Sequence, residues 1–276
     1  MKVKDVMTKK VQSVEVPGNR EEALELLRKL RVSALPVLKR GTQELVGMVR
    51  LRDFFENPDE DQLGMLVNRD VPTVQEDDSL RDAARKMLET SSRRLPVVRD
   101  GNLVGIITVR DIVHRAIAEM DIKDPASKYM QRPLATVWEG TPLQVAVEIM
   151  GLAEVRALPV INEEGELVGI IDDSDIIAVS EIETESRIEQ MKGRSEGDSW
   201  TWDSEDRIYI TKKRLKPPKK PVKEVMSRDL ITIGRRTSVS ECAKLMKEKN
   251  IEQVPVVTAE GNFIGMVRDE DLLQAL

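Results

Sequence analysis

The spacing of apolar residues changes in the same order four times along the chain. In the first copy, an alternating stretch at 11–16 predicts a strand, and apolar residues three or four positions apart at 20–30 predict an amphipathic helix. Two short apolar runs, 35–38 and 45–49, predict a pair of strands joined by a polar turn, and a second helix is expected from near Leu51. Each copy is therefore predicted to fold as β-α-β-β-α over about 55 residues, too few to bury both faces of its own sheet.

Recurring residues at matched spacing define the four copies. A methionine or valine stands at a constant distance before a proline, in the pairs Met7 and Pro36, Val67 and Pro96, Met130 and Pro159, and Met226 and Pro255. A glycine stands six residues before an aspartate, in the pairs Gly47 and Asp53, Gly105 and Asp111, Gly169 and Asp175, and Gly265 and Asp271. Internal repetition of this kind decides the architecture before any single motif does.

The copies divide the chain into four repeats and one insertion. Copy one is expected at 1–62, copy two at 63–120, copy three at 121–180 and copy four at 222–276, with a longer segment at 181–221 between the last two. This organisation predicts an α/β protein whose small units must pair to bury their sheets.

The insertion carries its own local signals. Residues 181–192 are expected to continue the last helix of copy three, whereas 207–211 alternate as a strand does. Trp200 and Trp202 allow two interpretations, a hairpin that packs on its own repeats and shields both indoles, or a docking surface for a protein partner.

Composition narrows the class of protein. With one cysteine and one histidine, the chain has no disulfide framework and no Cys/His metal cluster, so we expect a reducing, cytoplasmic setting. No stretch reads as a signal peptide or a membrane span. A net charge of −6 argues against a general nucleic-acid surface. No phosphate-binding glycine loop or histidine-based catalytic set is present, so we expect a binding protein rather than an enzyme, with no cofactor.

The repeats resemble the CBS domain, named after cystathionine β-synthase. The matching features in this chain include Asp-Val-Met at 5–7, Leu-Pro-Val at 95–97, and a glycine, two apolar residues and a final aspartate within 105–111. In that family two repeats pack through their sheets into a pseudo-two-fold module, with adenosyl ligands such as AMP, ADP, ATP or S-adenosylmethionine in the clefts between them. The resemblance implies two such modules, copies one with two and three with four, arranged as a disc within one chain or through a homodimer.

Copy two carries the most complete candidate site. Thr108 and Asp111 lie where a buried strand is predicted to enter a helix, and the unpaired N–H groups of a helix start suit a phosphate. The resemblance assigns the phosphate to Thr108 and the ribose hydroxyls to Asp111, and it assigns the base to the strand start at Thr73 and Val74. Taken alone, Thr-x-x-Asp is equally a capping box that only completes a helix.

The other copies are secondary candidates. Arg50 with Asp53 and Arg268 with Asp271 place a cation where copy two has its threonine, and a cation can also meet a phosphate. Arginine is a poor helix cap, so Asp53 and Asp271 are not expected to complete a capping box. Copy three is ranked last because Asp172, three residues before Asp175, would repel a phosphate.

Arginines just before the recurring proline add a second set of candidates. Arg93, Arg94 and Arg156 resemble phosphate-binding positions of the γ subunit of AMP-activated protein kinase, itself a four-repeat CBS protein, and a guanidinium can hold phosphate oxygens in bidentate fashion. Ser33 and Glu252 occupy this place in copies one and four. The alternative for each arginine is an ordinary solvated side chain.

Together these features predict a regulatory protein that senses an adenine nucleotide and signals to a protein target. Two alternatives stay open at this point. One is a scaffolding repeat protein with empty clefts, and the other is a regulatory subunit that binds S-adenosylmethionine. Ligand-induced stabilisation separates the scaffold from the sensors.

Overall fold

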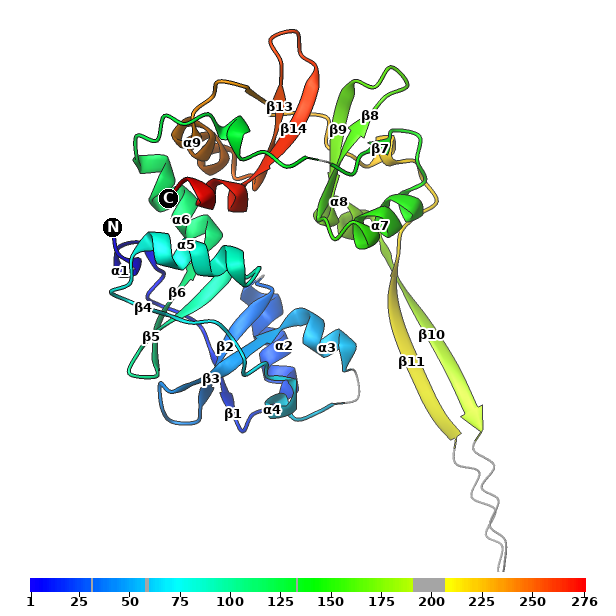
Figure 1. The fold of residues 1–276 in the computed structure, drawn as a ribbon. Coiled ribbons are helices and arrows are strands. Elements are labelled where there is room, and N and C mark those ends of the chain that lie inside the picture. The colour runs from blue at the N-terminus through cyan, green and yellow to red at the C-terminus, as the bar shows by residue number, and fades with distance from the viewer. Residues whose placement is uncertain (31, 58–59, 133, 191–206) are drawn as a thin grey trace, which may run out of the picture. The chain divides into compact units, whose positions relative to one another are not determined.

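The structure is a computed structural model that describes residues 1–30, 32–57, 60–132, 134–190 and 207–276 (Figure 1). Trp200 and Trp202 lie outside the described residues, so both interpretations of them stay predictions.

Each copy builds one three-stranded mixed sheet, as its periodicity predicts. The first strand runs parallel to the second, and the second pairs antiparallel with the third. The strands are β1 (Val14–Val16), β2 (Ala34–Lys39) and β3 (Leu45–Arg50) in copy one, and β4 (Val74–Gln75), β5 (Arg94–Arg99) and β6 (Asn102–Thr108) in copy two. Copy three has β7 (Val137–Trp138), β8 (Ala157–Ile161) and β9 (Leu167–Asp172), and copy four has β12 (Ile233–Gly234), β13 (Gln253–Val257) and β14 (Phe263–Arg268).

Two helices complete each copy, one between the first two strands and one after the third. They are α2 (Arg20–Leu30) and α3 (Leu51–Glu56), α5 (Leu80–Glu89) and α6 (Val109–Arg115), α7 (Leu143–Leu152) and α8 (Asp173–Val179), and α9 (Val239–Lys249) with the 3-10 helix η4 (Asp269–Ala275). Short turns stand outside these pairs: α1 (Val3–Val6), α4 (Leu63–Leu66), η1 (Ile117–Glu119), η2 (Ala126–Lys128) and η3 (Val222–Glu224). The predicted order β-α-β-β-α is confirmed in all four copies.

Local sequence signals set several helix ends. The Ser79 hydroxyl accepts the backbone N–H of Asp82 at the start of α5, and the Ser238 hydroxyl accepts that of Glu241 at the start of α9. Asn250 ends α9 in the left-handed conformation at φ 56°, where asparagine is one of the few tolerated residues. The ends of these two helices therefore follow from their own residues.

Paired copies exchange their leading segments, the stretches that precede each first strand. The leading segment of copy one lies on copy two, where the Thr8 N–H donates to the Ile106 carbonyl at 2.9 Å. The leading segment of copy two lies on copy one, where Asn68 and Met48 exchange two backbone hydrogen bonds of 2.9 Å. Each sheet is thus completed by its partner.

Copies three and four repeat this exchange. The Gln131 N–H donates to the Met266 carbonyl at 2.8 Å, so the leading segment of copy three lies on β14 of copy four. Ser227 and Ile170 exchange backbone bonds of 2.9 and 3.0 Å, so the leading segment of copy four lies on β9 of copy three. The exchange explains why the compact units do not follow the sequence copies. Unit one comprises Met1–Arg132 and Thr232–Leu276, and unit two comprises Pro133–Ile231.

The core of unit one joins the helices of copy two to those of copy four (Figure 1). Helix α9 packs on η1, with Cys242 and Met246 fully buried. Ser240, the buried polar residue of α9, donates to the Ile117 carbonyl at 3.1 Å and accepts the Ile122 N–H at 2.9 Å. Its hydroxyl is therefore satisfied inside an apolar contact.

The insertion forms a two-stranded antiparallel hairpin, β10 (Glu181–Gln190) and β11 (Arg207–Lys216) (Figure 1). The strand expected at 207–211 is confirmed. The helix expected at 181–192 is wrong for 181–190, because Ile182, Thr184, Ser186 and Ile188 alternate with the period of two that suits a strand.

Among the helices of the described residues, none is long and apolar enough to cross a membrane.

The exchange of leading segments depends on close approach at the glycine of each third strand. A Cβ on Gly47 would collide with the Asn68 carbonyl oxygen and lie 2.8 Å from Val67 Cγ1, so Gly47→Ala is expected to destabilise the protein by about 1–3 kcal/mol. Gly64→Ala is the control, because its Cβ would meet Val16 Cγ1 at an ordinary 4.0 Å. Urea unfolding measures both, and equal losses in the two variants would contradict the proposed role of Gly47.

The buried thiol provides a probe of the contact between copies two and four. Burial raises the pKa of Cys242 to about 12, so its reactive thiolate is scarce in the native state. We expect Ellman's reagent to label Cys242 only as the protein unfolds in urea. Rapid labelling without urea would contradict the packing of α9.

Candidate functional site

The recurring aspartate lies in the first turn of the last helix of each copy. One of its oxygens accepts the backbone N–H of the N-cap residue, three positions earlier. The four bonds are Arg50 N to Asp53 Oδ2 at 2.8 Å, Thr108 N to Asp111 Oδ2 at 3.0 Å, Asp172 N to Asp175 Oδ2 at 3.1 Å, and Arg268 N to Asp271 Oδ2 at 2.8 Å. All four aspartates thus supply the carboxylate half of a capping box.

This geometry corrects the expectation for Asp53 and Asp271. The N-cap residue offers its backbone N–H whatever its side chain is, so an arginine at that place does not prevent the carboxylate from capping. A capping role accounts for the aspartate in every copy and does not by itself indicate a ligand.

The other carboxylate oxygen distinguishes three of the copies. Asp53, Asp111 and Asp271 are all buried, at 7%, 8% and 2% exposure. The partners of their Oδ1 atoms differ: Arg50 Nη2 at 2.9 Å for Asp53, Arg115 Nη1 at 3.2 Å for Asp111, and Gln131 Nε2 at 2.7 Å with Arg268 Nη2 at 3.1 Å for Asp271. The Oδ1 atoms could accept hydrogen bonds from a ligand while the Oδ2 atoms keep their bonds to the N-cap N–H groups.

The charge states follow from these contacts. The hydrogen bond to Asp53 raises the pKa of the Arg50 guanidinium, with burial opposing it, so Arg50 stays charged. Asp175 is partly buried, and this burial raises the pKa of its carboxyl group. The neighbouring charge of Asp172 acts in the same direction.

Thr108 and Asp111 are brought together as predicted. The Thr108 hydroxyl accepts the Asp111 N–H at 3.1 Å and donates to Asp111 Oδ2 at 2.7 Å. The hydroxyl is therefore engaged within the capping box, and its assignment to a phosphate stays a prediction.

A cleft of about 720 Å³ lies beside Arg50 in unit one. Copy one contributes the start of β2, the end of β3 and the start of α3, and copy two contributes its leading segment and residues 90–94, which lead into β5. The charged lining residues are four arginines, Arg50, Arg52, Arg93 and Arg94, and one carboxylate, Asp70. Such a cleft favours an anionic ligand, and its volume lies in the usual range for small-molecule sites.

The exchange of leading segments decides which strand start faces which helix start. Residues 70–72, which lead to Thr73 and Val74, line the cleft beside Arg50 in copy one. The Thr73 carbonyl accepts Lys86 Nζ at 2.8 Å, and Val74 is buried in the sheet of copy two. The base contact of Thr73 and Val74 therefore stays a prediction, while the segment that borders the strand of Thr108 is that of Thr8.

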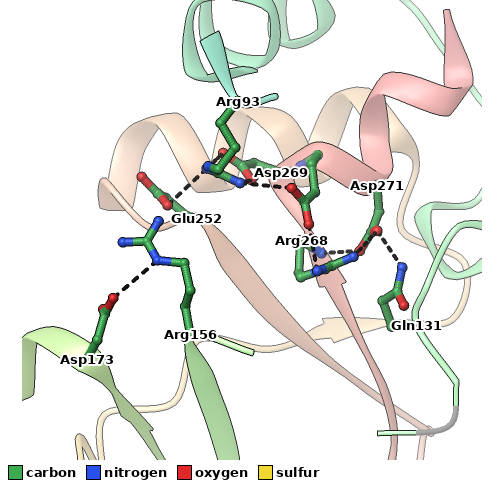
Figure 2. Close-up of polar contacts among 9 residues, drawn as sticks. Arg93, Gln131, Arg156, Asp173, Glu252, Arg268, Asp269 and Asp271 are labelled. Atoms are coloured by element: carbon green, nitrogen blue, oxygen red, sulfur yellow. Dashed lines mark hydrogen bonds and ion pairs between the residues drawn. The ribbon is translucent and has the colours of Figure 1, made fainter. Parts of the chain in front are cut away.

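Arg93 is held by three carboxylates of copy four (Figure 2). Its Nη1 lies 3.0 Å from Asp269 Oδ1 and 3.2 Å from Glu270 Oε2, and its Nη2 lies 2.8 Å from Asp269 Oδ2 and 3.0 Å from Glu252 Oε2. Burial lowers the pKa of Arg93, but these acids outweigh it and raise the pKa overall. Arg93 therefore remains a cation that copy four binds in a bidentate way.

Arg94 and Arg156 make different contacts. Arg94 Nη2 donates to the Ser33 hydroxyl at 2.8 Å, across the cleft that both residues line. In unit two, Arg156 Nε donates to Asp173 Oδ2 at 3.2 Å (Figure 2). Phosphate binding by either arginine stays a prediction.

Arg52 and Asn68 line the cleft although the sequence did not single them out, and the acids Asp269 and Glu270 of η4 were missed as partners of Arg93. The spacing of the repeats gives no signal for such contacts between copies. Among the described residues, no group of histidine, cysteine and carboxylate side chains could hold a metal ion.

Comparison with known proteins agrees with this architecture. The CBS domain model matches residues 3–60, 63–118, 126–181 and 222–276. The crystal structure of an uncharacterized conserved protein from Pyrococcus horikoshii shares 35% identity, with a TM-score of 0.73 and 99% of each chain covered. The crystal structure of MJ1225 from Methanocaldococcus jannaschii, described as a candidate archaeal homologue of γ-AMPK, has a TM-score of 0.68 over 99% of each chain. At 20% sequence identity, this match shows only that the two folds are similar.

A relative in sequence is the uncharacterized protein MJ1404 of Methanocaldococcus jannaschii, with 26% identity over 275 residues. That alignment covers 99% of this chain, which spans 61% of the length of the relative. The matches to the family model run through four β-α-β-β-α repeats. This chain belongs to the CBS domain family and carries four copies of the domain.

Proposed function

We propose that this chain is a regulatory protein that binds an adenine nucleotide in the clefts between paired CBS copies and signals to a protein target in the cytoplasm, without catalysing a reaction. The observation that carries the proposal is the cleft of about 720 Å³ lined by four arginines and one carboxylate. A nucleotide has the negative charge and the size that such a cleft accepts.

The phosphates and the ribose of a nucleotide have candidate partners around this cleft. Arg50, Arg52 and Arg94 can meet phosphate oxygens, which suit the planar guanidinium. Asp53 lies next to Arg50, and its Oδ1 can accept ribose hydroxyls while its Oδ2 keeps the helix start capped. The cleft beside Arg50 is therefore a first candidate together with the site predicted at Thr108 and Asp111.

Electrostatics favour nucleotides over S-adenosylmethionine in this cleft. S-adenosylmethionine carries one carboxylate but two cationic groups, a sulfonium and an ammonium, and the guanidinium groups that line the cleft disfavour both cations. ATP, ADP and AMP gain from the same charges in proportion to their phosphates.

A signal requires that the ligand bind one arrangement of the protein more tightly than another. The scaffold alternative has one specific observation in its favour, the β10–β11 hairpin, because an isolated two-stranded sheet is only marginally stable until it is covered. Calorimetric titration with adenosine, AMP, ADP, ATP and S-adenosylmethionine separates the two functions. If none of them bound, the scaffold would stand.

Paired substitutions at the two candidate sites, Asp53 and Asp111, identify where the nucleotide binds. Asp53→Asn retains an acceptor for the N-cap N–H but removes the charge that would receive ribose hydroxyls, so adenosine and AMP should both bind more weakly, by on the order of 1–3 kcal/mol. Asp111→Asn is the matched variant in copy two. Calorimetry on both variants assigns the cleft, and unchanged affinity in both would remove the recurring aspartates from the site.

An arginine substitution tests the phosphate role. Arg94→Gln should spare adenosine but weaken ADP and ATP, and more strongly at low salt, because the lost attraction is electrostatic. Arg99→Gln, at the far end of the same strand and paired with Glu76, is the control. Equal losses for adenosine and ATP in Arg94→Gln would contradict the assignment.

A further inference from the structure

Arg93 belongs to two sites at once. It lines the cleft between copies one and two, and its guanidinium is bonded to Glu252, Asp269 and Glu270 of copy four. Its side chain is 29% exposed, whereas that of Asp269 is only 3% exposed. The contact is therefore buried at Asp269 and partly exposed at Arg93.

Arg93 belongs to a cluster of carboxylates and guanidinium groups at copy four. The described contacts of this cluster also include Arg268, whose Nη2 lies 3.1 Å from Asp271 (Figure 2). The Nη1 of Arg268 lies 2.6 Å from Glu270. These contacts join the two guanidinium groups to the carboxylates of Glu252, Asp269, Glu270 and Asp271. A buried carboxylate that lost its cation would be strongly disfavoured, so the cluster holds Arg93 firmly.

Phosphates in the cleft would compete with this cluster for the same cation. A guanidinium has a fixed set of donors in one plane, and both terminal nitrogens of Arg93 are already directed at carboxylates of copy four. A ligand without phosphates makes no such demand. The competition therefore grows with the number of phosphates that reach the arginines.

We propose that Asp269, together with Glu252 and Glu270, sets the selectivity of the cleft beside Arg50 among adenine nucleotides. These acids hold Arg93 and so keep it from the phosphates of the nucleotide. The inference rests on the proposed function, since it names residues outside the cleft that decide which nucleotide the cleft prefers. The cleft then binds ATP less tightly than its four arginines would otherwise allow.

The same competition links the cleft to copy four. By linkage, a phosphate that draws on Arg93 weakens the bond between Arg93 and Asp269, and a tighter bond between those residues weakens phosphate binding by the same factor. Asp269 is thus a positioning residue, which acts on the ligand through Arg93.

The test is a cycle of variants titrated with adenosine and ATP by calorimetry. Asp269→Asn should tighten ATP binding by about fivefold or more, the lower end of typical coupling between sites, and leave adenosine binding unchanged. The milder variant Glu252→Gln, which alters a half-exposed acid, should give a smaller shift in the same direction. In an Arg93→Gln background, Asp269→Asn should no longer tighten ATP binding.

The control is Glu248→Gln, which removes an equal charge from the exposed surface of α9. An equal gain in ATP affinity from Glu248→Gln would reduce the effect to general charge and overturn the inference. Unchanged ATP affinity in Asp269→Asn, or a gain that persists without Arg93, would overturn it as well while leaving the proposed function intact. If the unaltered protein bound none of the adenine nucleotides, the proposed function itself would fail, and the inference with it.

Discussion

Each of the four sheets pairs with backbone from another copy, through the leading segments that the copies exchange. A sheet of three short strands cannot cover its own surface, and each sheet here is extended by backbone from the paired copy, as between Thr8 and Ile106 or Ser227 and Ile170. The glycine of each third strand allows this close approach, since Met7 lies over Gly105 and Met226 over Gly169. Pairing is therefore built into the backbone and does not rely on side chains alone.

The exchange also produces the candidate site. Because the leading segment of copy two lies on copy one, residues around Asn68 and Asp70 face Arg50 and the capped helix start of Asp53. The cleft thus combines a helix start from one copy with a strand start from the other. A single copy would supply only part of its lining.

Copies two and four meet through positions that correspond in the repeat. Arg93 and Glu252 both stand three residues before the recurring proline, and they pair with each other at 3.0 Å. Copy two has an arginine and copy four has a glutamate at this place in the repeat, so the two equivalent positions carry opposite charges. Differences in sequence between the copies can in this way create an ion pair between them. Here one residue of that pair, Arg93, also lines the cleft.

Periodicity and spacing are local properties, so the sequence alone predicted the four copies, their order of strands and helices, and the position of each aspartate at a helix start. The sequence did not show that Asp53 caps its helix although the N-cap residue is an arginine. The carboxylate accepts the backbone N–H of that residue, which does not depend on the type of its side chain. Only the tertiary structure decided which strand start faces which helix start, and that Arg93 meets Asp269, 176 residues away. Contacts between such distant residues depend on how the copies exchange their segments, and no local pattern records that choice.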